Sequence, residues 1–291
     1  LSLLELLLLL VGKMPMFDAL TLTFGTAGTG GFGIKNDSIG SYTTYQQTVI
    51  TIFMILFGVN FNVYFLFLLK KIRQGLKNEE LRAYLGIILG AILLITVNIA
   101  GKFGNPFLAF HHAAFQVGSI ITTTGYSTVD FDTWPTFSKT VLVLLMFIGA
   151  SAGSTGGGIK VSRIVILAKS VKKELKQYLH PHSISKIKMD GKPVEHEVVR
   201  SINVFLIAYL LIYAVSMLII SLDNFDFTTT FTSVAATINN IGPGLDLVGP
   251  AANFGILSVP SKLVLVFDML AGRLEIFPLL LLFVPDTWRK F

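Results

Sequence analysis

The chain has 291 residues, of which 53% are hydrophobic and 14% are charged, whereas soluble domains carry about 25% charged residues. A mean hydropathy of +0.70 predicts a polytopic membrane protein. Cysteine is absent from these residues, which excludes disulfides, thiolate metal sites and cysteine nucleophiles within them. The net charge of +6 raises the question of nucleic acid, but the placement of the charges argues for membrane topology instead.

The first segment, Leu1–Val11, is apolar but too short to cross a bilayer, which takes about 20 residues. It has no basic leader and no small-residue cleavage site, so a signal peptide is not indicated. We expect it to be the end of a spanning helix that begins upstream. Four later stretches approach or exceed the spanning length: Val49–Leu69, Ala83–Ala100, Val198–Leu222 and Ser258–Val284.

The stretch GTAGTGGFG at Gly25–Gly33 contains a G-x-G-x-x-G pattern at Gly28, Gly30 and Gly33. A dinucleotide-binding loop follows a buried strand, opens a helix and has an acidic residue about 20 positions later. Here the glycines follow a predicted helix, and Phe53 stands where the acidic residue is needed. The pattern therefore does not predict a phosphate site.

Basic residues gather in the connectors on one side of the predicted spans. Seventeen of the 23 lie there: Lys70, Lys71, Arg73, Lys77, Arg82, Lys160, Arg163, Lys169, Lys172, Lys173, Lys176, Lys186, Lys188, Lys192, Arg200, Arg289 and Lys290. The positive-inside rule places these connectors in the cytoplasm, and no nucleic-acid partner is needed to explain them. The glycine turns then lie toward the cell exterior.

A unit of span, short helix, polar glycine turn and span occurs three times. The short helices are predicted at Phe17–Thr26, Phe110–Ile121 and Phe227–Thr237, and Thr29-Gly30, Thr124-Gly125 and Ile241-Gly242 mark the turns, at intervals of 95 and 117 residues. Segments of about 10–13 residues reach only about half of the hydrocarbon core, so they must enter the membrane and return.

Backbone that is not helical survives at membrane depth only where it is buried in protein or lines water. Glycine allows successive carbonyl groups to turn inward, and the carboxyl end of a short helix favours a cation. We therefore interpret the turns as a backbone-carbonyl site for a dehydrated cation. Ordinary tight turns between helices are the alternative.

A spanning helix is predicted to start at Thr140–Ile148 and to resume at Ile159–Leu175. Between them, GASAGSTGGG has five glycines in ten residues, which predicts a loop within the membrane. The Gly-Lys-Ser/Thr of a Walker loop is missing here. For the glycine-rich run, the alternative is a flexible kink in the helix.

Arg273 lies within the last span, and Glu275 at i+2 does not share its helix face, so we expect Arg273 to face the pore or a distant residue. For Arg273, the alternative is a buried ion pair with a purely structural role.

Together these passages resemble the Trk/Ktr/HKT superfamily of potassium transporters, and specifically its TrkH branch. The resemblance covers nearly the whole chain and rests on TGGF at Thr29–Phe32, TTTGY at Thr122–Tyr126, NNIGPGL at Asn239–Leu245, GASAGSTGGGIK at Gly149–Lys160 and GRLEIFPLLLL at Gly272–Leu282.

The resemblance implies an all-α polytopic membrane protein of repeated helix, re-entrant pore helix and helix units around a central pore, as in potassium channels. The second unit would cover residues 1–73, the third 74–177, with its intramembrane loop at 149–160, and the fourth 178–291 after a cytoplasmic connector. The family has four such units, so the first is expected outside these residues.

The implied filter residues are Gly28, Thr29, Gly30, Thr123, Thr124, Gly125, Asn240, Ile241 and Gly242, with potassium held by their carbonyl groups. The implied gate residues are Gly153, Gly156, Gly157, Gly158 and Lys160 in the intramembrane loop, together with Arg273, which would oppose cations beneath the filter.

The resemblance further implies potassium uptake across the cytoplasmic (inner) membrane, a homodimer embedded in lipid, no cofactor besides the transported K⁺, and a nucleotide-binding regulatory subunit of the TrkA type that contacts the basic segment Lys169–Lys192. The alternatives are a pore-like scaffold subunit and a membrane-embedded enzyme. An enzyme would need a nucleophile–base set or paired carboxylates at one depth, which the sparse acidic residues do not supply.

Overall fold

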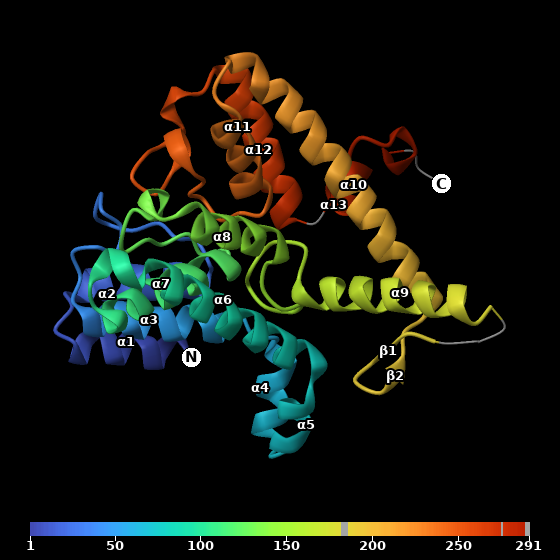
Figure 1. The fold of residues 1–291 in the computed structure, drawn as a ribbon, viewed down its shortest axis with the longest axis horizontal. Helices are drawn as coiled ribbons and strands as arrows, with labels where there is room; N and C mark the ends of the chain where they lie inside the picture. Colours follow the sequence, from blue (N-terminus) through green and yellow to red (C-terminus); the bar gives the residue numbers. More distant parts are fainter. Residues whose placement is uncertain (182–185, 275, 289–291) are drawn as a thin grey trace.

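The computed structural model describes residues 1–181, 186–274 and 276–288, and these are mostly helical (Figure 1). The α-helices are α1 Ser2–Val11, α2 Met16–Ala27, α3 Thr44–Phe57, α4 Phe61–Leu68, α5 Ile72–Lys77, α6 Glu79–Phe103, α7 Pro106–Ile121, α8 Thr136–Ile148, α9 Val161–Leu179, α10 His196–Ile220, α11 Phe227–Ile238, α12 Val259–Arg273 and α13 Ile276–Leu281. A short antiparallel hairpin joins β1 Lys188–Met189 to β2 Lys192–Pro193. Glu275, Arg289 and Lys290 lie outside the described residues.

The three predicted short helices are observed as α2, α7 and α11. The starts of α7 and α11 follow local capping chemistry: the Asn105 side chain accepts from the Phe107 N–H with Pro106 at the first position of α7, and Asp226 accepts from the N–H groups of Thr228 and Thr229 at the start of α11. Helix α7 therefore begins four residues earlier than the sequence predicted.

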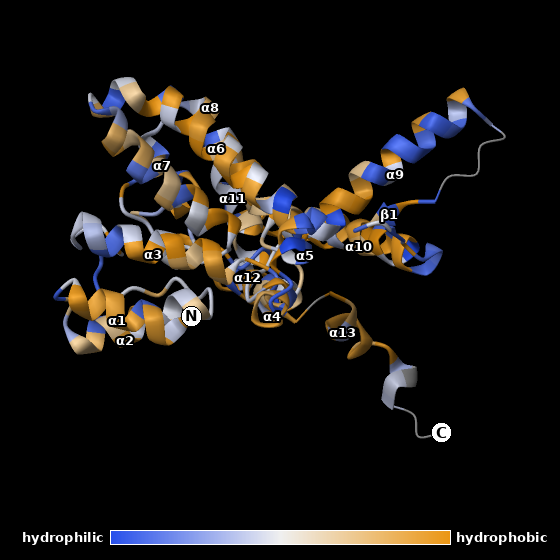
Figure 2. Ribbon diagram, turned by 90° about the horizontal axis from the view of Figure 1, so that it is seen from below, coloured by the Kyte–Doolittle hydropathy of each residue, from blue (hydrophilic) through white to orange (hydrophobic). Residues whose placement is uncertain are grey.

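Among the residues that the structure describes, two helices are long and apolar enough to cross a membrane: Glu79–Phe103, which is α6, and His196–Asp223, which begins with α10. They contain the predicted spans Ala83–Ala100 and Val198–Leu222. Their outer faces keep large apolar side chains exposed, such as Val97 and Leu211, as expected for helices that face lipid. Figure 2 shows these apolar segments in orange, whereas the far part of α9 is mostly polar.

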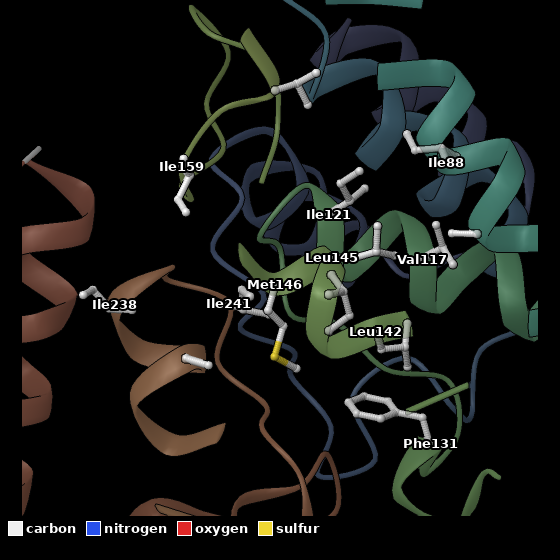
Figure 3. Close-up of a cluster of buried hydrophobic side chains, with 14 of the residues drawn as sticks. Ile88, Val117, Ile121, Phe131, Leu142, Leu145, Met146, Ile159, Ile238 and Ile241 are labelled. Atoms are coloured by element: carbon white, nitrogen blue, oxygen red, sulfur yellow. The ribbon is translucent and has the colours of Figure 1, made fainter. Parts of the chain in front are cut away.

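Buried aliphatic side chains join the third and fourth units. Ile121 of α7, Leu145 and Met146 of α8, and Ile241 after α11 belong to one cluster, to which α6 contributes Ile88 (Figure 3). A second cluster holds α1, α2 and α3 together, and it includes Phe115 and Tyr126 of the third unit. The cores therefore fix the turns after the short helices relative to one another.

The span predicted at Val49–Leu69 is not one continuous helix, because α3 and α4 are bent by 90° at residues 58–60. Gly58 lies so close to Tyr84 that an added Cβ would be 2.2 Å from the tyrosine hydroxyl. The Gly58 carbonyl accepts a hydrogen bond from the Ser151 N–H at 3.0 Å. The Asn60 side chain then caps α4 through the Asn62 N–H. Tertiary contacts with the intramembrane loop thus stabilise a break within an apolar run.

The span predicted at Ser258–Val284 is also interrupted, since α12 ends at Arg273 and α13 begins at Ile276. Near this end, an added Cβ on Gly272 would lie 1.8 Å from the Ile238 carbonyl oxygen. The backbone of α12 therefore touches the carboxyl end of α11, and this contact brings Arg273 to the level of the turns.

Candidate functional site

Three turns follow the short helices: the first turn (residues 28–32), the second turn (122–126) and the third turn (239–243). They share one backbone conformation, with two left-handed positions separated by one residue. The φ angles are 50°, 57° and 55° at Thr29, Thr123 and Asn240, and 68°, 87° and 106° at Gly31, Gly125 and Gly242. Only glycine adopts the second position without strain.

The hydrogen bonds of the turns repeat as well. The N–H groups of Thr29, Thr123 and Asn240 each donate to a carbonyl three residues earlier, and those of Gly30, Thr124 and Ile241 each donate to a carbonyl five residues earlier. Each turn is thus tied to the carboxyl end of its own short helix, whose dipole favours a cation.

This geometry corrects the sequence alignment of the first turn by one residue. The sequence pattern pairs Gly30 with Gly125 and Gly242, but in the structure Gly30 occupies the place of Thr124 and Ile241. The glycine equivalent to Gly125 is Gly31. Two adjacent glycines, Gly30 and Gly31, made the register ambiguous in the sequence.

The turns pack against one another in order. A Cβ on Gly31 would lie 1.8 Å from the Thr124 carbonyl oxygen, and a Cβ on Gly125 would lie 1.8 Å from the Ile241 carbonyl oxygen. The same position on Gly242 has open space, with no heavy atom within 4 Å. A cleft of about 700 Å³ separates the third turn from the first and includes Thr29, Gly31 and Gly242 in its lining.

The intramembrane loop (149–160) lies directly against all three turns. Thr29 Oγ1 donates to the Thr155 carbonyl at 3.1 Å, and the Gly157 N–H donates to Thr123 Oγ1 at 2.7 Å. A Cβ on Gly157 would be 2.7 Å from the Asn239 carbonyl oxygen. A small chamber of about 160 Å³ lies between this loop and helices α10 and α12.

The expected gate residues of the loop lie at its bends and edges. Gly153 and Gly158 have φ angles of 65° and 80°, and the Gly153 carbonyl accepts from the Phe61 N–H at 3.1 Å. Gly156 packs beneath the second turn, where an added Cβ would be 2.9 Å from the Thr122 carbonyl oxygen. Lys160 donates to the carbonyl of Gly156.

Arg273 reaches the first turn from the end of α12. Its Nη2 donates to the Gly28 carbonyl at 2.8 Å, and its Nη1 donates to Thr29 Oγ1 at 3.2 Å. The arginine also lines both the cleft and the small chamber. The guanidinium charge therefore lies beside the first turn, in contact with Gly28 and Thr29, which are far from Arg273 in the sequence.

Sequence reasoning missed some residues that position the turns. The Asn239 amide nitrogen donates to the Tyr209 hydroxyl at 3.0 Å and to the Ala235 carbonyl at 2.8 Å, which fixes the start of the third turn. Thr155 supplies the carbonyl that meets Thr29. Asn239 stood inside a quoted motif and could have been found there, but Tyr209 lies within an apolar span and gave no signal.

Comparisons with known proteins agree with this architecture. A family model described as TrkH, cation transport protein, matches residues 105–290. The chain is 36% identical over 281 residues to the Trk system potassium uptake protein TrkH of Salmonella typhimurium, covering 95% of this chain and 58% of that protein. The corresponding protein of Vibrio parahaemolyticus is 38% identical over 287 residues, covering 97% and 59%.

A solved structure shows the same fold. The crystal structure of the potassium transporter TrkH from Vibrio parahaemolyticus matches with a TM-score of 0.91 and 35% identity, over 99% of this chain and 63% of that one. The chain thus spans about three fifths of the length of these relatives. The expected helical membrane fold and the expected branch of the superfamily are confirmed, and the chain belongs to the TrkH family of cation transport proteins.

Proposed function

We propose that this chain forms most of a potassium-selective pore for uptake across the cytoplasmic membrane. The main support is the stack of three turns with the same backbone conformation, in which Gly31 and Gly125 each meet a carbonyl group of the next turn. Rings of carbonyl oxygen atoms replace the hydration shell of an ion in such filters. The relatives with this fold are named potassium uptake proteins, which favours transport over an enzyme or a scaffold.

The ion would be held by carbonyl groups of the expected filter residues, with Thr29 and Gly30 matched to Thr123 and Thr124 and to Asn240 and Ile241. Gly31 takes the place that the sequence analysis gave to Gly30. Because each short helix ends at its turn, three helix dipoles add a negative potential at the same site.

A complete ring needs a fourth turn in the cleft between the third and first turns. The open space beside Gly242 supports this, because the corresponding positions in the first and second turns are filled by a neighbouring carbonyl. The units at residues 1–73, 74–177 and 178–291 would then occupy three quarters of the ring, and a further unit would supply the fourth.

The intramembrane loop would act as the gate, since one segment touches all three turns from the cytoplasmic side. Arg273 would add an electrostatic barrier beside the first turn. Opening then requires the loop to leave the Thr29 and Thr123 hydroxyl groups.

The relatives are named as parts of Trk systems, which indicates association with other components of those systems. For this chain we propose a homodimer in lipid and a nucleotide-binding subunit of the TrkA type. Basic residues on α9 and the connector, from Lys169 to Lys192, support a cytoplasmic docking face for an acidic partner surface.

Tracer rubidium uptake into liposomes tests the function on the complete transporter. We expect flux of potassium and rubidium well above that of sodium, and loss of flux in Gly125→Asp. Gly104→Asp is the matched control, because Gly104 also has a positive φ, of 62°, but no neighbour within 4 Å of an added Cβ. Equal flux in the Gly125→Asp and unmodified transporters would contradict the filter assignment.

A further inference from the structure

The amino-terminal end of α6 carries a buried carboxylate that holds both ends of the intramembrane loop. Glu80 is 4% exposed. Its Oε1 accepts from the Ala152 N–H at 2.6 Å and from the Ser162 N–H at 3.2 Å. Ala152 lies near the start of the loop, whereas Ser162 lies in the first turn of α9, just after the loop ends.

The same carboxylate is anchored to the bend between α3 and α4. Its Oε2 accepts from Asn60 Nδ2 at 3.1 Å. Helix α9 begins at Val161, and the side chain of its N-cap residue Lys160 makes no capping hydrogen bond. Glu80 therefore supplies the negative charge and the acceptor that this helix start needs. Glu80 therefore determines where the loop enters, where it leaves and how α9 begins.

On the cytoplasmic side, the residues before Glu80 are held by the hairpin of β1 and β2. Asp190, between the two strands, accepts from Asn78 Nδ2 and from the Glu79 N–H, both at 2.7 Å. Lys169 of α9 donates to the Glu79 carboxylate and also to the Lys188 carbonyl, the latter at 2.7 Å. The hairpin thus caps the helix that presents Glu80.

We propose that Asn78–Glu80 is a latch that couples the cytoplasmic hairpin to the intramembrane loop. The first N–H groups of a helix have no partner within the helix, and here Asp190 satisfies that of Glu79. When the hairpin moves away, Asn78 and Glu79 lose their hydrogen bonds to Asp190, so Asn78, which caps α6 through the Leu81 N–H, is no longer held in place and the first turn of α6 frays. Glu80 then releases the Ala152 and Ser162 N–H groups, and the loop is free to leave the turns.

This latch makes Glu80 and Asp190 positioning residues for the loop, and it rests on the proposed gating role of the loop. If a cytoplasmic partner displaced the hairpin, the movement would be passed through Asn78, Glu79 and Glu80 to the intramembrane loop, and from the loop to the filter. No ion needs to bind for the coupling to operate, so it can be measured apart from flux.

These 291 residues contain no cysteine, so one reporter thiol can be introduced among them once any cysteine elsewhere in the complete transporter has been replaced. In the complete transporter, Ser154→Cys places that thiol in the loop, beside the small chamber, and a membrane-impermeant thiol reagent is added from the cytoplasmic side. We expect Glu80→Gln to raise the labelling rate about tenfold, because the loop loses a charged acceptor. Asp190→Ala should raise it about fivefold, since it removes two hydrogen bonds further from the loop.

Because the two residues act in series, the double variant should label no faster than Glu80→Gln alone. The matched controls are Glu174→Gln and Glu195→Ala, which remove acidic side chains from α9 and from the same connector and should leave the rate unchanged. If Glu80→Gln does not yield folded protein, Asn60→Asp keeps the α4 cap while it places a second carboxylate beside Glu80, and it should also raise the rate.

Unchanged labelling in Glu80→Gln, or in Asn60→Asp where it replaces that variant, would overturn the latch. Unchanged labelling in Asp190→Ala, or additive effects in the double variant, would overturn its coupling to the hairpin. Rubidium flux measured on the same variants separates the two proposals. Faster labelling with unchanged flux would support the latch and contradict the gating role of the loop.

Discussion

The glycine at the second left-handed position of each turn meets two separate requirements. Its φ is positive, and its missing Cβ leaves room for the carbonyl oxygen of the next turn at Gly31 and Gly125. The first requirement concerns only the local backbone, whereas the second concerns the contact between units. Substitutions can therefore separate local strain from the packing of the turns.

Gly125→Ala should abolish selective flux and lower the free energy of unfolding by about 1–3 kcal/mol, because the new Cβ collides with the Ile241 carbonyl. Gly104→Ala has a similar φ but open space, so it should cost only about 1 kcal/mol of strain and keep selectivity. Thermal unfolding and potassium-to-sodium flux ratios check both variants. Equal behaviour of the two would show that packing between turns is unimportant.

Arg273→Ala should raise cation flux through the open pore at least about tenfold, because a cation about 4 Å from a guanidinium is repelled by about 4 kcal/mol at an effective dielectric constant near 20. Arg273→Lys keeps the charge and should stay close to the unmodified rate. The measurement is rubidium uptake at matched protein amounts. Unchanged flux in Arg273→Ala would argue against a position in the pathway.

At the scale of elements, two breaks in apolar helices lie against each other beside the site. The bend between α3 and α4 and the intramembrane loop between α8 and α9 bind each other through the Gly58 and Gly153 carbonyl groups. Neither break would be stable alone in a membrane, because each exposes backbone groups that need partners. Together, each break supplies hydrogen-bond partners for backbone groups of the other.

Gly58→Ala should destabilise this contact by about 1–3 kcal/mol, since the new Cβ would lie 2.2 Å from the Tyr84 hydroxyl. Tyr84→Phe removes that hydroxyl and its 3.0 Å bond to the Ile55 carbonyl, so it should cost about 1 kcal/mol alone. The double variant should recover part of the stability lost in Gly58→Ala. Strict additivity in thermal unfolding would contradict the proposed contact.

Thr123→Val should loosen the loop beneath the filter, because it removes the hydroxyl that accepts from the Gly157 N–H at 2.7 Å. We expect about tenfold more rubidium flux at rest, as one buried hydrogen bond is worth about 1 kcal/mol or more. Thr123→Ser keeps the oxygen and is the control. Lower flux in Thr123→Val with unchanged flux in Thr123→Ser would show that the hydroxyl supports the filter instead.

At the scale of the whole molecule, the three turns occupy successive positions and leave a cleft between the last and the first. The second turn, between its two neighbours, is the most enclosed, with Thr123 and Thr124 fully buried, whereas Gly30 and Gly242 are exposed beside the cleft. A symmetric oxygen ring therefore requires a fourth contribution.

Gly242→Ala tests this arrangement in the complete transporter. If a fourth turn fills the cleft, the Cβ of residue 242 meets its carbonyl, and flux should fall as much as in Gly125→Ala. If the space stays open, only strain of about 1 kcal/mol remains, as expected for Gly104→Ala. Rubidium uptake by the three variants, side by side, distinguishes these outcomes.

Much of this architecture could be predicted from local patterns. Short apolar segments before polar glycine turns predicted α2, α7 and α11, and the glycine-rich run predicted the interruption between α8 and α9. Local patterns failed where distant contacts decide. The bend at Gly58 depends on Tyr84 and Ser151, and the alignment of Gly31 with Gly125 depends on which carbonyl each glycine meets.

The sequence by itself determined the membrane class, the three repeated units and the residue types of the turns, because hydropathy, glycine content and helix length act over a few neighbouring residues. Only the tertiary structure decided how the turns align, which partner Arg273 has and what holds the intramembrane loop. Those features depend on hydrogen bonds and packing between residues far apart in the chain, such as Arg273 with Gly28 and Glu80 with Ala152, which only the folded chain brings together.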